Sequence, residues 1–254
     1  MCMKTLKSLN GIFAVHKPYG ITSAQLLEKI KDIVQKELSI SRKYIKFGHG
    51  GTLDSTATGV LVIGSGSATP QLKYLIGGEK EYFVKGCLGK STDTLNEAGK
   101  VTEELPFDHV TESQLAFKLL NFQGRIKQVP PLYSALKLKG QRYSDIAREG
   151  NSITPTARFV HCYEAQLEGF SPPFFTLKLL TGRGFYVRSL VNDLGKEVGS
   201  CAHVCELVRT RQGPFTLKNS LQEDQWSVKN ITKAIRYSTK KKNKYVQDCI
   251  DNKW

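Results

Sequence analysis

The stretch GHGGTLDSTATGVLVI, residues 48–63, is the part of the sequence that decides how the chain is interpreted. Three glycines, a histidine and Asp54 lie within its first seven residues, so these residues predict a loop whose main chain a bulky ligand can approach. The apolar run at residues 60–63 predicts a short buried strand after the loop. Asp54 is therefore a candidate functional carboxylate. The heptapeptide alone is explained equally well by a structural loop in which Asp54 is a cap.

The residues on either side of this stretch predict further strands and helices. A strand is expected at residues 11–15, and a capping box at Thr22 predicts a helix over residues 23–38. Thr69 followed by Pro70 has the form of an N-cap and first helical residue. Further strands are expected at residues 82–88, 159–167 and 175–179, and further helices at residues 111–122, 142–149 and 187–198. Because strands and helices do not alternate regularly, the pattern favours a single α+β domain with a mixed, largely antiparallel sheet flanked by helices.

The charge of the chain favours a nucleic-acid partner. Its 254 residues include 37 Lys and Arg but only 23 Asp and Glu, which gives a net charge of +14. A surplus of this size attracts polyanions. Anionic membrane is disfavoured, because no amphipathic basic helix or lipidation motif stands out in the sequence. The longest apolar run, residues 60–63, is also far too short to span a bilayer.

Cofactor and metal sites are not expected from the sequence. It contains no P-loop, no complete dinucleotide fingerprint and no Gly-x-Ser-x-Gly elbow. Six scattered cysteines without a Cys-x-x-Cys pair indicate reduced thiols in an intracellular protein. Cys201, His203 and Cys205 are close in sequence, but a second pair of ligands at suitable spacing is missing, so no metal is predicted.

Two further residues become candidates once Asp54 is suspected. Tyr82 lies on a predicted strand, and an aromatic ring can stack on an unpaired base. Arg188 lies where a glycine turn meets the start of a helix, and an arginine can hold a carboxylate bidentately. A core aromatic and a surface arginine remain the structural alternatives for these two residues.

Taken together and in order, these segments resemble the TruB family of pseudouridine synthases. The matching segments are KPYGITS at 17–23, GHGGTLD at 48–54, ATGVL at 57–61, KEY at 80–82, LGKSTDT at 88–94, QVPPLYSALK at 128–137, GFYVR at 184–188, DLG at 193–195, AH at 202–203 and LVRT at 207–210. The resemblance covers residues 11–226. The Gly-Gly form of the aspartate motif and PPFFTL at 172–177 are similar to the eukaryotic branch of the family.

The resemblance implies isomerisation of a uridine to pseudouridine in the T arm of tRNA, at position 55 in tRNA numbering. The base would be flipped out of the folded loop into a pocket. Asp54 matches the catalytic aspartate of the family, and Arg188 would pair with it. Tyr82 would stack on the target base and assist proton transfer. The family needs no metal or cofactor.

The resemblance also assigns substrate-binding roles. His49 would hold the place of the extruded nucleotide, while Tyr186 and Leu207 would line the pocket. Lys17 would support either the RNA or the active-site loop. One departure concerns Pro70, which stands where relatives often carry a basic residue, so one RNA contact is expected to be lost or moved.

The expected organisation is an N-terminal extension at residues 1–10, a catalytic domain at 11–237 and a Lys-rich tail at 238–254. No separate C-terminal RNA-binding module is expected. The protein would act as a monomer, without guide RNA, on tRNA and on other RNAs with a similar stem-loop, in the nucleus or cytoplasm rather than the mitochondrion. A non-catalytic RNA-binding or RNA-folding protein on the same fold is the alternative.

Overall fold

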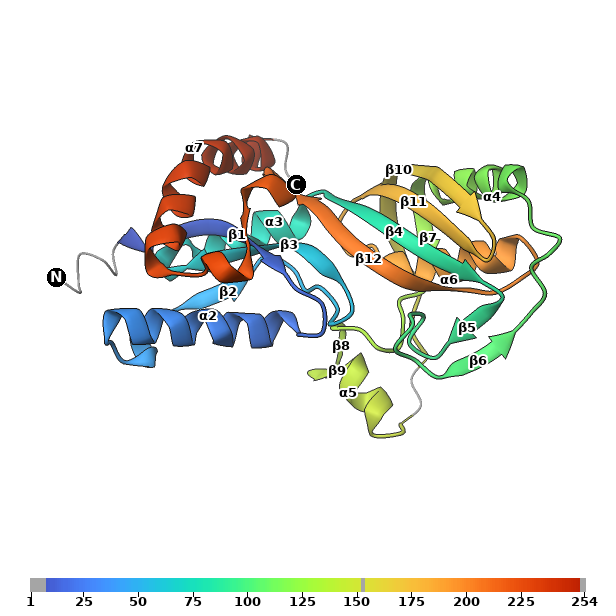
Figure 1. The fold of residues 1–254 in the computed structure, drawn as a ribbon, viewed down its shortest axis with the longest axis horizontal. Coiled ribbons are helices and arrows are strands. Elements are labelled where there is room, and N and C mark those ends of the chain that lie inside the picture. The colour runs from blue at the N-terminus through green and yellow to red at the C-terminus, as the bar shows by residue number, and fades with distance from the viewer. Residues whose placement is uncertain (1–7, 152–153, 252–254) are drawn as a thin grey trace. The chain divides into compact units, whose positions relative to one another are not determined.

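The structure is a computed structural model that describes residues 8–151 and 154–251 (Figure 1). The chain forms two compact units: one contains the residues up to Glu81 and those from Val208 onward, and the other contains residues 82–207. The expected catalytic span, residues 11–237, therefore comprises two units. Strands β4 (Lys80–Leu88) and β12 (Ala202–Gln212) each have residues in both.

The first unit is built on a sheet with the strand order β14-β1-β3-β12. Strand β1 is antiparallel to β3 and parallel to β14, and the last part of β12 joins β3 in parallel through Val208 and Arg209. The strands of this unit are β1 (Gly11–Lys17), β2 (Phe47–His49), β3 (Thr58–Ser65), β13 (Phe215–Thr216) and β14 (Ser220–Leu221). The strand predicted at 60–63 is thus the centre of β3, and the strand predicted at 11–15 is confirmed as β1.

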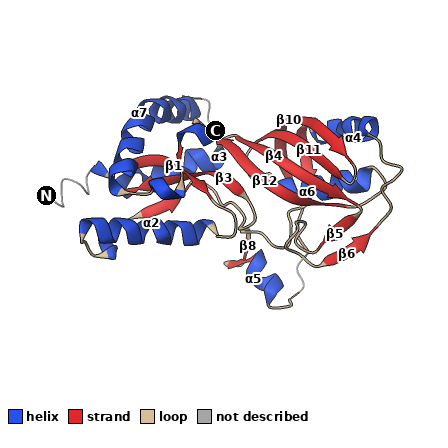
Figure 2. Cartoon of the chain, in the orientation of Figure 1, coloured by secondary structure: helices blue, strands red, loops and turns tan. Residues whose placement is uncertain are grey.

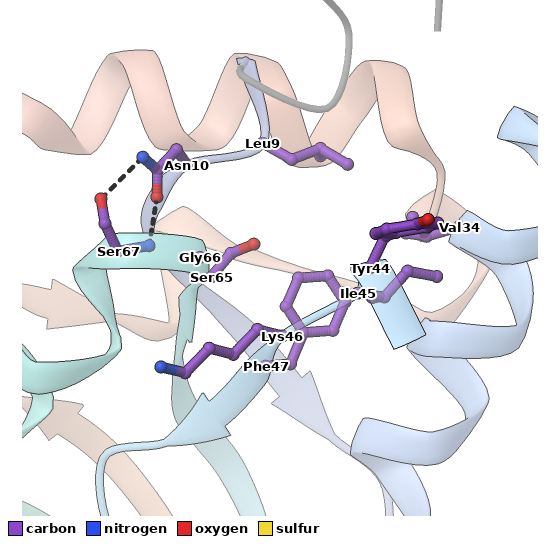
Figure 3. A pocket seen from close by; sticks show the side chains of 10 residues that line it. All are labelled: Leu9, Asn10, Val34, Tyr44, Ile45, Lys46, Phe47, Ser65, Gly66 and Ser67. Atoms are coloured by element: carbon purple, nitrogen blue, oxygen red, sulfur yellow. Dashed lines mark hydrogen bonds between the residues drawn. The ribbon is translucent and has the colours of Figure 1, made fainter. Parts of the chain in front are cut away.

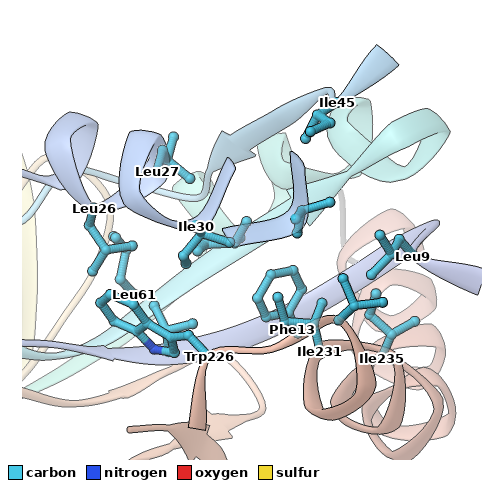
Figure 4. Packing of buried hydrophobic residues seen from close by; sticks show 14 residues of the cluster. Leu9, Phe13, Leu26, Leu27, Ile30, Ile45, Leu61, Trp226, Ile231 and Ile235 are labelled. Carbon is cyan, nitrogen blue, oxygen red and sulfur yellow. The ribbon is translucent and has the colours of Figure 1, made fainter. Parts of the chain in front are cut away.

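Alternate residues of β1 build the two hydrophobic cores of this unit, as the two-residue period of a strand requires. Phe13 and Val15 pack with helix α2 (Ser23–Leu38) and with the start of α7 (Val228–Asp251), the cluster shown in Figure 4. Ile12 and Ala14 belong to a second cluster, which includes Leu72 and Leu75 of α3 (Leu72–Gly77). The sheet is therefore covered on both faces.

Helix α2 begins and ends as its sequence predicts. The Thr22 side chain accepts a hydrogen bond from the amide of Gln25, and the Gln25 side chain bonds back to the amide of Thr22, which completes the capping box. The helix ends at Ser39 in a left-handed conformation with φ of 50°. Its apolar residues at helical spacing, among them Leu26 and Ile30, are fully buried.

The predicted helix start at Thr69 and Pro70 is wrong. Both residues lie inside a 3-10 helix, Gly66–Gln71, and α3 begins only at Leu72. The Thr69 hydroxyl donates to the Gly66 carbonyl at 3.0 Å, three residues earlier, so it closes a turn already formed instead of capping a new one. Proline fits here because the first turns of a helix do not need its missing N–H.

The Lys-rich segment expected to be a tail from residue 238 continues helix α7 instead. The boundary falls inside the helix, where Ser238 donates to the Ile12 carbonyl of β1 at 2.9 Å. Ile231 and Ile235, four residues apart, pack into the first core, and Cys249 is also buried. The apolar face of the helix, which the run of lysines hides in the sequence, explains this difference.

The second unit contains a sheet with the order β12-β4-β11-β10-β7 (Figure 2). Strand β10 pairs antiparallel with both β11 and β7, and helix α4 contacts both β10 and α6. Its elements are β4, β5 (Lys90–Thr92), β6 (Val101–Glu104), α4 (Glu112–Leu119), β7 (Gly124–Gln128), β8 (Lys137–Leu138), β9 (Gln141–Arg142), α5 (Tyr143–Arg148), β10 (Arg158–Ser171), β11 (Phe174–Thr181), α6 (Val187–Glu197) and β12.

The remaining sequence predictions of this unit are confirmed to within a few residues. The helix predicted at 111–122 is α4 with Thr111 as its N-cap, continued by a short 3-10 turn. Strand β10 is longer than predicted, since it is paired with a neighbour on each edge. The α+β class with a mixed, largely antiparallel sheet is confirmed. Among the described residues, no helix has both the length and the apolar character needed to cross a membrane.

Candidate active site

Asp54 lies in the loop between β2 and β3, in the first unit, and is half-buried. The loop leaves β2 through Gly51, whose φ of 132° is a conformation that favours glycine. Its end is closed by the amide of Ala57, which donates to the Asp54 carbonyl at 3.1 Å. His49 is the last residue of β2 and is paired with Ile63 of β3. The sequence GHGGTLD thus forms a strand end followed by a tightly turned loop.

One side of the Asp54 loop is held by the turn between β1 and α2. Lys17 donates from Nζ to the carbonyls of Pro18, Ile21 and Ser55, at 2.8, 2.7 and 3.3 Å. The Ser55 carbonyl also accepts from the amide of Gly20 at 2.9 Å. The segment KPYGITS, which precedes the loop by some thirty residues, is therefore its direct support.

Ser23 adds a reciprocal pair of bonds on the same side of the loop. Its hydroxyl donates to the Leu53 carbonyl at 3.1 Å and accepts from the Leu53 amide at 2.9 Å. Leu53 is itself buried. The residue before Asp54 is consequently fixed at both its amide and its carbonyl.

Lys17 places a buried amine beside the loop. It is 0% exposed, and burial, the largest cause, lowers its pKa to about 8. The Asp54 carboxylate acts against this shift and the Arg209 guanidinium adds to it. With its amine enclosed by carbonyl groups, Lys17 contacts the Asp54 loop in this structure. Its expected role in binding substrate stays a prediction.

Strand β12 also holds the loop, through two residues for which the sequence predicted no role. Arg209 is 1% exposed and donates to the carbonyls of Val60 at 2.7 Å, Gly51 at 3.2 Å and Thr52 at 3.5 Å. The Gln212 amide donates to the carbonyl of Gly50 and, at 3.1 Å, to that of Leu75. Arg209 belongs to the LVRT segment that resembles the family, and this was the only hint of its importance in the sequence. In a chain with so many basic residues, the sequence does not distinguish a buried arginine from one on the surface.

The other expected site residues belong to the second unit. Tyr82 is 7% exposed on β4, and Leu207 is 8% exposed on β12. Tyr186 is the N-cap residue of α6 and is held at two points by Gln128. The Gln128 side chain accepts from the Tyr186 amide at 2.8 Å and donates to the Tyr186 carbonyl at 3.0 Å.

Arg188, the second residue of α6, is 5% exposed and firmly oriented. Nη1 donates to the Thr94 carbonyl at 2.8 Å, and Nη2 donates to the Tyr133 carbonyl at 2.9 Å. The two acceptors belong to the segments LGKSTDT and QVPPLYSALK. Arg188 is therefore not a surface helix residue. Its guanidinium is fixed by backbone carbonyls of these two segments, which both belong to the resemblance to the family.

A separate hollow of about 250 Å³ lies in the first unit (Figure 3). Two hydrogen bonds between Asn10 and Ser67, both 2.7 Å long, close one end of it. None of the expected site residues lines it. The lining residues are Leu9, Asn10, Val34, Tyr44, Ile45, Lys46, Phe47, Ser65, Gly66 and Ser67.

Comparison with known proteins assigns the family. The family model for the N-terminal domain of TruB family pseudouridylate synthases matches residues 36–187. The model for the C-terminal domain of tRNA pseudouridylate synthase B matches residues 188–252. The chain therefore belongs to the TruB family, and it is an RNA pseudouridine synthase.

Individual relatives agree with this assignment. Pseudouridylate synthase TRUB1 of Homo sapiens is 49% identical over 242 residues, which are 91% of this chain and 69% of that protein. The tRNA pseudouridine synthase B of Clostridium tetani (strain Massachusetts / E88) is 35% identical over 96% of this chain and 81% of its own. In a crystal structure of a Cbf5-Nop10-Gar1 complex, one chain is 27% identical with a TM-score of 0.64; the match covers 88% of this chain and 55% of that one.

Proposed function

We propose that this chain isomerises the T-arm uridine of tRNA, position 55 in tRNA numbering, to pseudouridine with Asp54 as nucleophile. The observation that carries the proposal is the position of Asp54 in a loop whose backbone is held by Lys17 at Ser55, by Ser23 at Leu53 and by Arg209 at Gly51. A nucleophile needs such fixed geometry, because misplacement by about 1 Å can cost a hundredfold in rate. The name of the Clostridium tetani relative supports tRNA as the substrate.

The proposed reaction needs no net addition to the substrate. The Asp54 carboxylate attacks either the base or the ribose C1′, and the bond between C1′ and N1 breaks. The base then turns, C5 bonds to C1′, and the bond to Asp54 breaks, which frees the carboxylate again. The proton displaced from C5 is lost and N1 gains one, so the product is an isomer of uridine. Only groups that position the substrate and transfer protons are required.

The other residues receive roles in binding and orientation. We assign Arg188 as the cationic partner of the Asp54 carboxylate, since its guanidinium is buried and oriented by two carbonyls. Tyr82 stacks on the flipped base, and Tyr186 and Leu207 line the pocket. His49 keeps the extruded nucleotide's place in the RNA. The protein acts as a monomer and without guide RNA.

The test compares the native chain with Asp54→Asn on an unmodified tRNA transcript. Asparagine keeps the size of aspartate but is not a nucleophile, so pseudouridine at the T-arm uridine is expected to fall below detection while tRNA binding is retained. Asp224→Asn is the matched control, because Asp224 is exposed in the 3-10 helix Glu223–Gln225, and it should retain full activity.

Two further results would decide between the alternatives. Because only purified protein and transcript are present, product formation also establishes independence from guide RNA. If the native protein binds the transcript and leaves every uridine unchanged, the catalytic proposal fails and a non-catalytic RNA-binding role replaces it.

A further inference from the structure

Strands β4 and β12 of the second unit bring together three side chains that the proposed reaction does not use. They are Cys87 on β4 and His203 and Cys205 on β12. One ligand atom of each lies within 4.8 Å of the other two. His203 and Cys205 share a face of β12 because they are two residues apart. Cys87 comes from the neighbouring strand, so two adjacent strands of one sheet supply all three groups.

The spacing of two of these ligand atoms matches one edge of a tetrahedral metal site. The distance between Cys205 Sγ and His203 Nε2 is 3.6 Å. With Zn–S near 2.3 Å and Zn–N near 2.0–2.1 Å, a tetrahedral angle separates the two ligand atoms by about 3.6 Å. The two atoms therefore already stand at the spacing that a shared zinc ion requires.

The histidine ring is oriented by a bond on its opposite nitrogen. His203 Nδ1 lies 2.9 Å from the Lys90 carbonyl oxygen, which accepts hydrogen bonds only, so Nδ1 carries the proton. The lone pair of the ring is then on Nε2, the nitrogen beside Cys205. Histidines that bind metals are commonly fixed in this way by a backbone carbonyl.

The ligand set differs from the one that the sequence suggests. Cys201, His203 and Cys205 are neighbours in sequence, and without further ligands they predict no metal site. In the structure Cys201 is 1% exposed and its thiol lies 3.7 Å from the Glu103 carbonyl. Cys87, more than a hundred residues earlier, takes the place that Cys201 cannot fill.

We propose that Cys87, His203 and Cys205 bind one Zn²⁺ ion, with the fourth ligand supplied by solvent. Two thiolates and one imidazole are donors that favour zinc in tetrahedral geometry. Both thiols lose a proton to solvent when the ion binds. His203 is 9% exposed and both cysteines are half-buried, so the ion has a route of entry. Bound zinc joins β4 to β12 and stabilises their pairing.

Cobalt is the probe for the first experiment. The full chain is reduced, treated with a chelator, freed of it and titrated with Co²⁺. We expect thiolate-to-cobalt charge-transfer absorption and the visible bands of tetrahedral Co²⁺ to saturate at one equivalent, and Zn²⁺ to displace them. Zn²⁺ should also slow alkylation of Cys87 and Cys205 at least tenfold and raise the melting temperature.

Variants test whether the two cysteines are ligands. Cys205→Ser and Cys87→Ser should lose the cobalt spectrum, while Cys249→Ser, in α7 of the first unit, should keep it. Circular dichroism of each metal-free variant shows whether it is folded. If a variant does not fold, the alkylation protection of the native chain decides.

Three results would overturn the proposal. The first is no one-to-one cobalt spectrum in the reduced native chain. The second is an unchanged spectrum in Cys205→Ser, which would place the metal elsewhere. The third is a disulfide between Cys87 and Cys205 that forms under mild oxidation in a chain that binds no metal when reduced, which would assign the two thiols to redox chemistry.

Discussion

Lys17 donates a hydrogen bond to the carbonyl oxygen of Ser55, the residue directly after Asp54, across 38 positions of sequence. The amine is completely buried, and its other two bonds close the turn between β1 and α2. A motif at the start of the chain therefore fixes the loop that carries the proposed nucleophile. Disturbance of Lys17 should affect both stability and catalysis, since the same bonds serve both.

The first prediction concerns pH. Burial lowers the pKa of Lys17 to about 8 from 10.5, so between these values the unfolded chain binds more protons than the folded chain. The contribution of this site to stability must then rise with pH in that window. Relative to Lys17→Met, the native free energy of unfolding should increase by about 2 kcal/mol between pH 7 and roughly pH 9.5. Denaturant titrations at the two pH values measure it.

The exposed Lys29 provides the control for that experiment. Lys29→Met should change the unfolding free energy equally at both pH values. If the difference between the native chain and Lys17→Met is independent of pH, the lowered pKa of Lys17 is contradicted.

The second prediction concerns Arg209. Arg209→Leu leaves three carbonyls without their buried donor, so the unfolding free energy should fall by about 3 kcal/mol. Pseudouridine formation should fall as well, because Gly51 and Thr52 lose their support. Arg211→Leu, two residues along the same strand, removes a partly exposed ion pair with Glu79 at 3.7 Å and a 3.4 Å hydrogen bond to the Gly213 carbonyl, and should cost less than about 1 kcal/mol. If the two substitutions lowered the unfolding free energy and the activity equally, Arg209 would not hold the Asp54 loop as the structure indicates.

The third prediction concerns Gly59, where β3 meets β12. Its φ is 104°, and an added Cβ would lie 2.3 Å from the Arg209 carbonyl oxygen. Gly59→Ala should therefore destabilise the chain by about 3 kcal/mol or prevent folding. Gly77→Ala meets open space and should change stability by less than about 0.5 kcal/mol. Thermal unfolding of the two variants gives the comparison.

The fourth prediction concerns salt. With a net charge of +14, tRNA binding should release counterions, and affinity should fall about tenfold or more between roughly 50 and 200 mM monovalent salt. Filter binding or fluorescence anisotropy measures the slope. Asp54→Asn removes no cation and should show the same slope. A flat response would contradict an electrostatic contribution to binding.

Local patterns predicted the elements that local interactions determine. The capping box of Thr22 and Gln25 predicts the start of α2, and the alternation of apolar and polar residues around Phe175 predicts β11. Each of these patterns lies within a few residues. The helix start predicted at Thr69 was wrong because the dipeptide Thr-Pro occurs both at the start of a helix and inside a 3-10 helix. The course of α7 was hidden because its buried residues are few among many lysines.

The contacts around the candidate sites required the tertiary structure. Asp54 and Arg188 were candidates from their local sequence and received roles from the resemblance, but the residues that hold them are distant in sequence and carry no local signal. Arg209 lies about 155 residues from Asp54, and its burial is not visible in a chain with 37 basic residues. Cys87 and Cys205 are likewise brought together only by the pairing of two strands.

Strand β12 carries residues of both the proposed zinc site and the support of the Asp54 loop. His203 and Cys205 lie near its start, Leu207 in its middle, and Arg209 and Gln212 near its end. Side chains alternate between the two faces of a strand. A one-residue insertion or deletion between Cys205 and Arg209 would therefore move either the zinc-binding pair or Arg209 and Gln212 to the opposite face of the sheet. Homologues that share both groups should therefore tolerate substitutions of Glu206 and Val208, but not changes in the length of this interval. Insertions should instead accumulate in the exposed turns of the molecule.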